Sequence, residues 1–190
     1  MVRFQSIAAE DVEPAPLIGL ALAYATLAFP ARDSIPASLS MIAASTGLAA
    51  ALIVLSVIDL KTFRLPDILT LPLILAGILL AQIFGWDSFA WRAASAIMGF
   101  GSAYAVARLY EAIRSRSGLG LGDAKLFAAS GAWVGGEGLI TVLLYACLAA
   151  MIAVLVAWLR DTAVTKSTAI PFGPFIAAGT WLVWLYGPLA

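Results

Sequence analysis

Long apolar segments recur along the whole of this 190-residue chain and are separated by short breaks. A helix needs roughly 17–25 mostly apolar residues to cross a bilayer, and in lipid the backbone must satisfy its own hydrogen bonds. Repeated segments of this length predict an all-α, polytopic bundle of transmembrane helices, because the strands of a β-barrel would be shorter and alternating. The segments cover approximately residues 16–30, 38–58, 68–84, 90–110, 120–135, 138–159 and 170–187.

These segments predict seven membrane spans, or six if the first is only a surface helix. Composition agrees, because 63% of the residues are hydrophobic, 12% are charged and the mean hydropathy is +1.00. Soluble domains are about half apolar and about a quarter charged. Glu10, Asp11 and Glu13 precede the first segment, where a secretory signal peptide would be basic, so we expect that segment to be retained. We treat residues 1–190 as one integral membrane domain.

The distribution of basic residues predicts how the bundle is oriented. Short cytoplasmic loops of membrane proteins are enriched in Lys and Arg. If the N-terminus lies inside, all of the eleven basic residues except Arg32 and Arg92 fall on the cytoplasmic side. The loops that carry Asp59 and Asp123 then open on the cytoplasmic face. Eleven acidic residues balance the basic ones, so no basic excess indicates binding to nucleic acid.

The residue types that are missing exclude several kinds of catalytic site. The chain has no histidine, which excludes a Ser-His-Asp triad and a histidine-ligated metal. Cys147 is the only cysteine in the sequence, and we expect a buried structural thiol there. A Ser-Lys pair remains formally available through Lys61, Lys125 or Lys166, but no serine lies in an evident nucleophile turn. We expect neither a metal nor a cofactor.

Asp59 and Asp123 are the candidate functional acids, because ionisable groups at membrane depth are costly and commonly functional. Asp59 directly follows an uninterrupted apolar run. Asp123 follows glycines at alternate positions, which allow the backbone to approach a neighbouring helix or an extended peptide closely. A structural interpretation is equally open for each acid, since Asp59 could simply pair with Lys61 or Arg64 and the glycines could form an interhelical turn.

Two carboxyl groups that face one aqueous pocket would supply the chemistry of peptide hydrolysis. One stays protonated and polarises the scissile carbonyl, while the other removes a proton from water. The same pair could relay protons in a transporter. The spacing of the two acids does not separate these two hypotheses.

Three segments of the chain resemble motifs of the bacterial type IV prepilin peptidases. Residues 59–73 resemble the first catalytic block of that family, and residues 120–126, continuing through 131–133, resemble its GxGD block. Residues 170–175 resemble its C-terminal motif. The three segments occur in the family's order and lie within roughly positions 50–185.

The resemblance implies an aspartyl endopeptidase of the bacterial inner membrane that uses Asp59 and Asp123 as its catalytic pair and needs no cofactor. Its substrates would be type IV prepilins or pseudopilins, cut at the cytoplasmic face, and its surroundings would include pilus or type II secretion machinery. Long family members carry a domain with two cysteine pairs and also N-methylate the cut pilin. Those cysteines are absent from this sequence, so we expect a short form that acts as a peptidase without methyltransferase activity.

Other residues of the three segments are candidates for binding substrate or shaping the site. Asp67 follows Pro66 at the start of a span, where its charge meets the helix dipole favourably, so a structural role explains it as well as substrate binding does. Lys125 could hold Asp123 ionised or meet the membrane interface. The remaining candidates are expected to shape the niche around Asp123 or the start of the last helix: Gly120, Gly122, Pro171, Gly173 and Pro174.

Two further hypotheses remain besides the peptidase. A proton-coupled transporter would more naturally place its acids at the bilayer midplane on broken helices, whereas these acids lie near one interface. A non-catalytic assembly factor of a pilus or secretion machine would not need both carboxylates.

Overall fold

The computed structural model describes residues 19, 21–25, 39–85, 88–114, 119–159 and 171–189, and every regular element within them is helical. Residues 21–25 form a short helical turn. The longer helices are α2 (Leu39–Thr62), α3 (Asp67–Phe84), α4 (Phe89–Arg114), α5 (Leu121–Leu159) and α6 (Gly173–Tyr186). No strand occurs in these ranges, so the prediction of an all-α bundle is confirmed.

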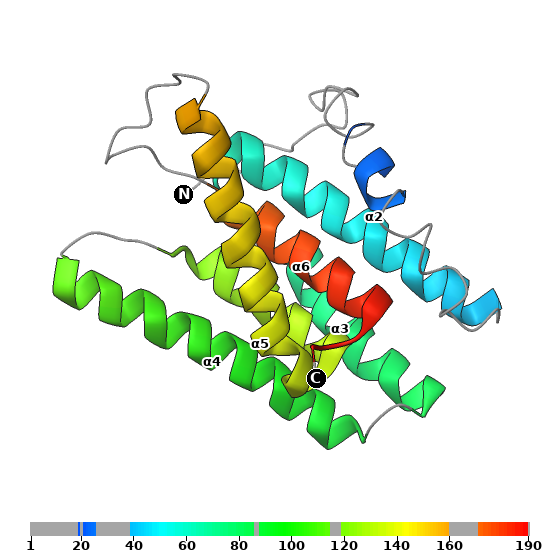
Figure 1. Ribbon diagram of the computed structural model, residues 1–190. Coiled ribbons are helices and arrows are strands. Elements are labelled where there is room, and N and C mark those ends of the chain that lie inside the picture. The colour runs from blue at the N-terminus through cyan, green and yellow to red at the C-terminus, as the bar shows by residue number, and fades with distance from the viewer. Residues whose placement is uncertain are drawn as a thin grey trace, which may run out of the picture.

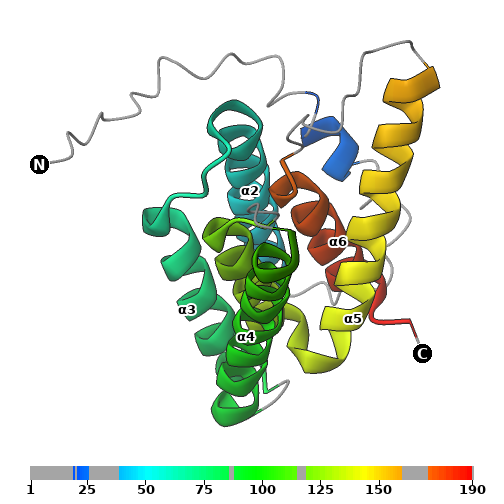
Figure 2. The ribbon, with the colours of Figure 1, turned by 90° about the vertical axis from the view of Figure 1, so that its left-hand side faces the viewer.

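The helices pack side by side around α5, which contacts α3, α4 and α6 (Figure 1). Helix α2 packs against α6 and more lightly against α3. In Figure 2, α3 lies at one edge of the bundle and the C-terminal half of α5, coloured yellow to orange, lies at the other. The order of the helices along the chain is therefore not their order across the bundle.

Helix α3 begins and ends at the residues that the sequence marks as breaks. Pro66 precedes it in an extended conformation, with φ −74° and ψ 135°. Gly85 ends it in the left-handed conformation, with φ 65°, and its N–H donates to the carbonyl groups of Ala81 and Gln82. A left-handed glycine after the last turn is the commonest way to satisfy free helix carbonyls. The predicted segment, 68–84, is displaced from this helix by one residue at its start.

Helix α5 contains the break that the sequence predicts between two of its apolar segments. Gly135 has φ 77° and ψ 170°, a conformation that other residues rarely adopt, so the helix axis turns there. The carbonyl of Trp133 lies beside the break and accepts a hydrogen bond from the buried guanidinium of Arg92. The two predicted segments, 120–135 and 138–159, are thus the two arms of α5.

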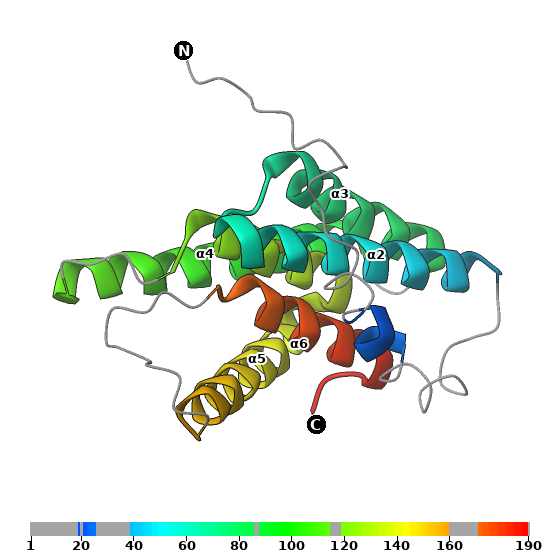
Figure 3. The same cartoon turned by 90° about the horizontal axis from the view of Figure 1, so that it is seen from above.

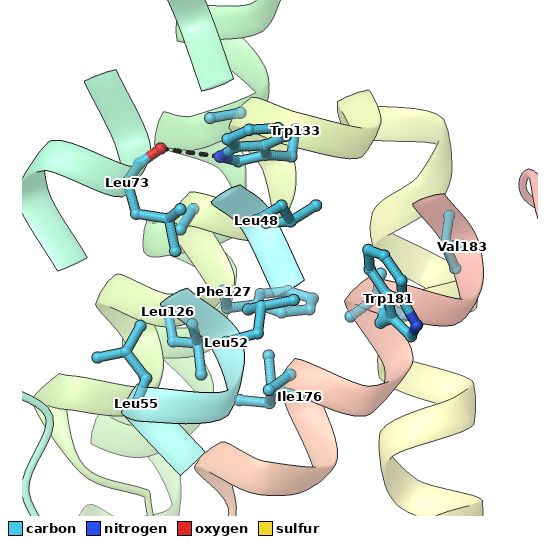
Figure 4. Packing of buried hydrophobic residues seen from close by; sticks show 14 of the residues in the cluster. Leu48, Leu52, Leu55, Leu73, Leu126, Phe127, Trp133, Ile176, Trp181 and Val183 are labelled. Carbon is cyan, nitrogen blue, oxygen red and sulfur yellow. Dashed lines mark hydrogen bonds between the residues drawn. The ribbon is translucent and has the colours of Figure 1, made fainter. Parts of the chain in front are cut away.

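The core is formed by apolar side chains from α2, α5 and α6, with a contribution from α3 (Figure 4). The indole N–H of Trp133 donates to the carbonyl of Leu73 at 2.8 Å, so the polar atom of this large side chain is satisfied. Ser130 and Thr180 form the polar contact between α5 and α6, with their hydroxyl oxygens 2.6 Å apart. The largest side chains of the core are almost fully buried: Leu48, Leu52, Leu55, Leu126 and Ile176.

The outer surface of the bundle is rich in exposed apolar side chains on α3, α4 and the C-terminal arm of α5. A soluble protein rarely exposes contiguous apolar surface on this scale, so the surface indicates a membrane protein. Within the described residues, α2 and α5 are long and apolar enough to cross a bilayer, and α3 is apolar but shorter, over Asp67–Ile83. The count of six or seven spans stays a prediction, because most of the first segment lies outside the described residues.

The expectation that Cys147 is buried is wrong. The residue is exposed and lies on the C-terminal arm of α5. Its neighbours Leu143, Leu144 and Leu148 are also exposed. An apolar thiol is compatible with a lipid-facing surface, so the apolar run around it does not mark the protein core.

Candidate active site

Asp59 lies at the C-terminal end of α2 and is 4% exposed. Its Oδ2 accepts a hydrogen bond from the backbone N–H of Gly173, the first residue of α6, at 3.0 Å. A carboxylate near the C-terminus of its own helix meets the unfavourable end of the helix dipole. The N-terminus of α6 supplies the favourable end of a second dipole together with a free N–H group, so α6 stabilises the acid.

Gly173 packs directly against the side chain of Asp59, so a larger residue at this position would have to displace the carboxyl group. A Cβ built on Gly173 would lie 2.6 Å from Oδ2 of Asp59 and 3.0 Å from its Cγ, closer than real Cβ contacts. Pro174 follows in the first turn of α6, where its missing N–H costs no helix bond. Pro171, Gly173 and Pro174 therefore lie at the start of the last helix, as the sequence predicts, and Gly173 also contacts one of the two candidate acids.

Asp123 is the third residue of α5, and its side chain is partly buried. Its Oδ2 accepts the backbone N–H of Gly120 at 3.1 Å. This is one half of a capping box, in which an acidic side chain in the first turn accepts the N–H of the residue that precedes the helix. The positive end of the helix dipole also favours negative charge at this position.

The structure brings Asp59 and Asp123 to the same end of the bundle. In Figures 1 and 3, the C-terminal end of α2 and the N-terminal ends of α5 and α6 all lie on the left-hand side. The two carboxyl groups lie close enough for their charges to interact. Arg92 lies near the start of α4, beside the break in α5, and it is distant from both acids in the sequence.

A cavity of about 310 Å³ lies beside Asp123. Asp123 lines this cavity, whereas Asp59 is not among its lining residues. The lining comes from the loop between α2 and α3 and from the start of α5: Phe63, Arg64, Leu65, Gly120, Leu121, Gly122, Asp123 and Lys125. The cavity is large enough to hold several side chains or a short piece of peptide backbone, and it contains one of the two candidate acids.

The glycines before Asp123 differ in how closely they are packed. A Cβ on Gly122 would lie 3.0 Å from Cβ of Leu65, so glycine allows α5 to approach the loop that follows α2. A Cβ on Gly120 would come no closer than 3.4 Å to Oδ2 of Asp123, which is ordinary van der Waals contact. Gly118 lies outside the described residues. The close approach expected of these glycines is therefore found at Gly122.

Lys125 forms an ion pair with Asp67 across the gap between α5 and α3. The two side chains are 29% and 58% exposed, so solvent screens the pair. Asp67 is the first residue of α3 and meets the favourable end of its helix dipole. The ion-pair partner of Lys125 is therefore Asp67 and not Asp123, while its contact with the membrane interface stays a prediction.

Sequence reasoning missed the contact between Gly173 and Asp59 and the role of Phe63 and Arg64 in lining the cavity. No periodic pattern links residues 114 positions apart, so the first contact had no sequence signal. Phe63 did have one, because an aromatic residue directly follows the apolar helix that carries Asp59. Within the described ranges, no cluster of three or more His, Cys, Asp or Glu side chains could hold a metal ion.

Comparison with known proteins gives a consistent set of relatives. The model of the type IV leader peptidase family matches residues 46–155. Among curated proteins, the chain is 44% identical over 139 residues to the prepilin leader peptidase/N-methyltransferase of Burkholderia pseudomallei and 37% identical over 138 residues to that of Pseudomonas aeruginosa. These matches cover 72% of this chain but only 44% and 47% of the two relatives. No solved structure gives a significant match.

Proposed function

The chain belongs to the type IV leader peptidase family, and on this premise we propose that it is an aspartyl endopeptidase that removes the leader peptide from type IV prepilins or pseudopilins. The activity is proposed for this chain as a single membrane domain, with its motifs in residues 50–185. The chain spans less than half the length of the curated relatives it matches. The proposal for this chain covers leader cleavage alone and not N-methylation.

The observation that carries the proposal is that Asp59 and Asp123 lie at the same end of the bundle, where their charges interact, with Asp123 lining a cavity (Figure 1). Two neighbouring carboxyl groups share one proton more easily than both ionise. The carboxylate removes a proton from water, and the hydroxide adds to the scissile carbonyl, whose oxygen is hydrogen-bonded by the protonated acid. Collapse of the tetrahedral intermediate breaks the C–N bond, and a proton passes to the leaving amine.

The surrounding residues have supporting roles in this mechanism. Gly173 holds the carboxylate of Asp59, and Gly122 lets the start of α5 approach the loop after α2. Pro171 and Pro174 fix the start of α6, while Gly120 donates to Asp123. Lys125 and Asp67 join α5 to α3 beside the cavity. Because Asp59 is buried, a bound peptide would have to widen the cavity toward α2 before both acids reach one water.

We place the site at the cytoplasmic face of the inner membrane. The basic residues Lys61, Arg64 and Lys125 lie in or next to the loops at the end of the bundle that carries both acids. The excess of Lys and Arg in cytoplasmic loops supports this orientation. The substrate would then present its leader on the side where it is synthesised, with pilus or secretion machinery as the receiver of the cut product.

Co-expression with a prepilin-like substrate tests the proposal, with leader removal followed as a mobility shift. Asp59→Asn and Asp123→Asn should each abolish cleavage while the protein level in the membrane stays unchanged. Asn is preferable to Ala at position 123, because an amide oxygen can still accept the N–H of Gly120. Glu111→Gln is the matched control, since this exposed acid on α4 pairs only with Arg108 among the described residues.

Normal processing by either Asn variant contradicts the catalytic pair. Acid-dependent ion flux in proteoliposomes without any cleavage would favour the transporter hypothesis instead. Pilus or secretion assembly that needs the chain but tolerates both Asn variants would favour the assembly factor.

A further inference from the structure

Resting on the proposed function, we propose that Phe63 is a substrate-contacting residue that selects an apolar side chain flanking the scissile bond. Phe63 follows Asp59 by four residues, directly after α2, and lies in the lining of the cavity that Asp123 also lines. Its backbone N–H donates to the carbonyl of Asp59 at 2.9 Å, and its side chain lines the cavity that contains Asp123. No other described residue combines these two relationships.

The backbone of Phe63 is held in a conformation that its residue type disfavours. Its φ is 52°, and it is the only non-glycine residue with a positive φ in the described ranges. A residue in this position, directly after a helix, is usually glycine, because a Cβ is strained there. Strained conformations of this kind cluster at active sites and ligand-binding sites. The strained backbone at residue 63 therefore indicates that its aromatic side chain has a function.

The side chain of Phe63 is 53% exposed although it lies in the cavity lining. Leu65 and Leu121 join it as apolar lining residues, while Arg64 and Lys125 supply positive charge. The cavity lining thus combines apolar and positively charged side chains with the carboxyl group of Asp123. An extended peptide that presents an apolar side chain to Phe63 would lie with its backbone within reach of Asp123.

A lipid contact is the competing explanation for an exposed aromatic ring near a membrane interface. Phe89 offers the matched comparison. It is 52% exposed and begins α4, and it does not line the cavity. If Phe63 and Phe89 were both exposed only in order to contact lipid, replacing either residue should have a similar effect on peptide cleavage.

The test uses the purified full chain in detergent with synthetic peptides that span a prepilin cleavage site. Each peptide carries Ala, Leu or Phe at one of the two positions that flank the scissile bond. The enzymes are the wild type, Phe63→Gly, Phe63→Leu and Phe89→Ala. For each we would measure kcat, KM, the thermal unfolding midpoint, and the affinity for a fluorescent peptide in an Asp123→Asn background.

Phe63→Gly should lower kcat/KM for the best peptide by about tenfold or more, mainly through KM, and should flatten the preference among Ala, Leu and Phe. Its unfolding midpoint should equal or exceed that of the wild type, because glycine relieves the strained backbone. Phe63→Leu should keep most of the preference. Phe89→Ala should cleave like the wild type.

The inference is overturned if Phe63→Gly retains both the preference and a kcat/KM within about twofold of the wild type, a difference too small for a lost apolar contact. It is equally overturned if Phe89→Ala shows the same loss. A wild type that cuts none of the peptides contradicts the proposed function instead. In that case the affinity for the fluorescent peptide tests the role of Phe63. Weaker binding by Phe63→Gly supports a contact between Phe63 and the peptide, and unchanged binding overturns it.

Discussion

The N–H of Gly173 reaches Oδ2 of Asp59 at 3.0 Å, which joins the first residue of α6 to the C-terminal end of α2. The acid that the sequence places at the end of an apolar run is thus held by the helix that is last in the chain. The hydrogen bond and the helix dipole act in the same direction, because both favour negative charge on Asp59. The geometry of the candidate active site therefore depends on how α6 packs against α2 and α5.

Gly173→Ala should move the carboxyl group of Asp59, because the new Cβ would lie 2.6 Å from Oδ2. Displacement of a catalytic group by about 1 Å commonly costs about a hundredfold in rate, so we expect leader cleavage to fall by at least about tenfold. The measurement is the initial rate on a prepilin-like substrate. Gly101→Ala on α4 is the control, since nothing lies within 4 Å of a Cβ there, and it should leave the rate unchanged. Equal rates for Gly173→Ala and the wild type would contradict the positioning role.

Ser130 and Thr180 should stabilise the packing of α5 on α6 by a modest amount. Their hydroxyl oxygens are 2.6 Å apart and both residues are buried, at 0% and 1% exposure. Interhelical hydrogen bonds in membrane proteins contribute about 0.6 kcal/mol on average and about 1.7 kcal/mol at most. A double-mutant cycle with Ser130→Ala and Thr180→Val, measured by unfolding in mixed micelles, should give a coupling free energy in that range. Additive effects of the two substitutions would show that the hydroxyl contact contributes nothing.

Arg92→Leu should destabilise the fold without removing the candidate catalytic acids. The guanidinium is buried and donates to the carbonyl of Trp133 beside the break in α5. Hydrogen bonds to charged groups contribute about 1.5–3 kcal/mol, so the free energy of unfolding should fall by about that amount. Arg108→Leu is the control, because its ion pair with Glu111 is exposed and should contribute less than about 1 kcal/mol. Equal losses in the free energy of unfolding for the two variants would show that the buried hydrogen bond of Arg92 contributes no more than the exposed ion pair of Arg108.

Removing the ion pair between Lys125 and Asp67 should have little effect on stability. Both side chains are partly exposed, and pairs of this kind contribute at most about 1 kcal/mol. We therefore expect Lys125→Met and Asp67→Asn each to change the free energy of unfolding by less than about 1 kcal/mol. Raising the salt concentration should reduce even this difference, because salt screens exposed charges. A large, salt-independent loss would indicate that the pair is buried when the protein lies in a bilayer.

The helices could be predicted from the sequence because their signals are local. Apolar runs gave the positions of α2 to α6, and Gly135 marked the turn inside α5. The two candidate acids could be found because the chain has no histidine and one cysteine, and because both acids lie in segments that resemble family motifs. The contacts that complete the site are long-range, such as Asp59 with Gly173 and Asp67 with Lys125, and no local pattern specifies them. Cys147 was misplaced because an apolar run in a membrane protein does not tell a lipid-facing residue from a core residue.

The link between Asp59 and Gly173 also sets an order of events during biosynthesis. The ribosome makes Asp59 114 residues before the group that holds it, so the bond cannot form until the last helix has been synthesised and packed. A nascent chain that ends before α6 contains both acids but lacks the donor that orients one of them. The candidate active site is therefore complete only after α6 has been synthesised and has packed against α2.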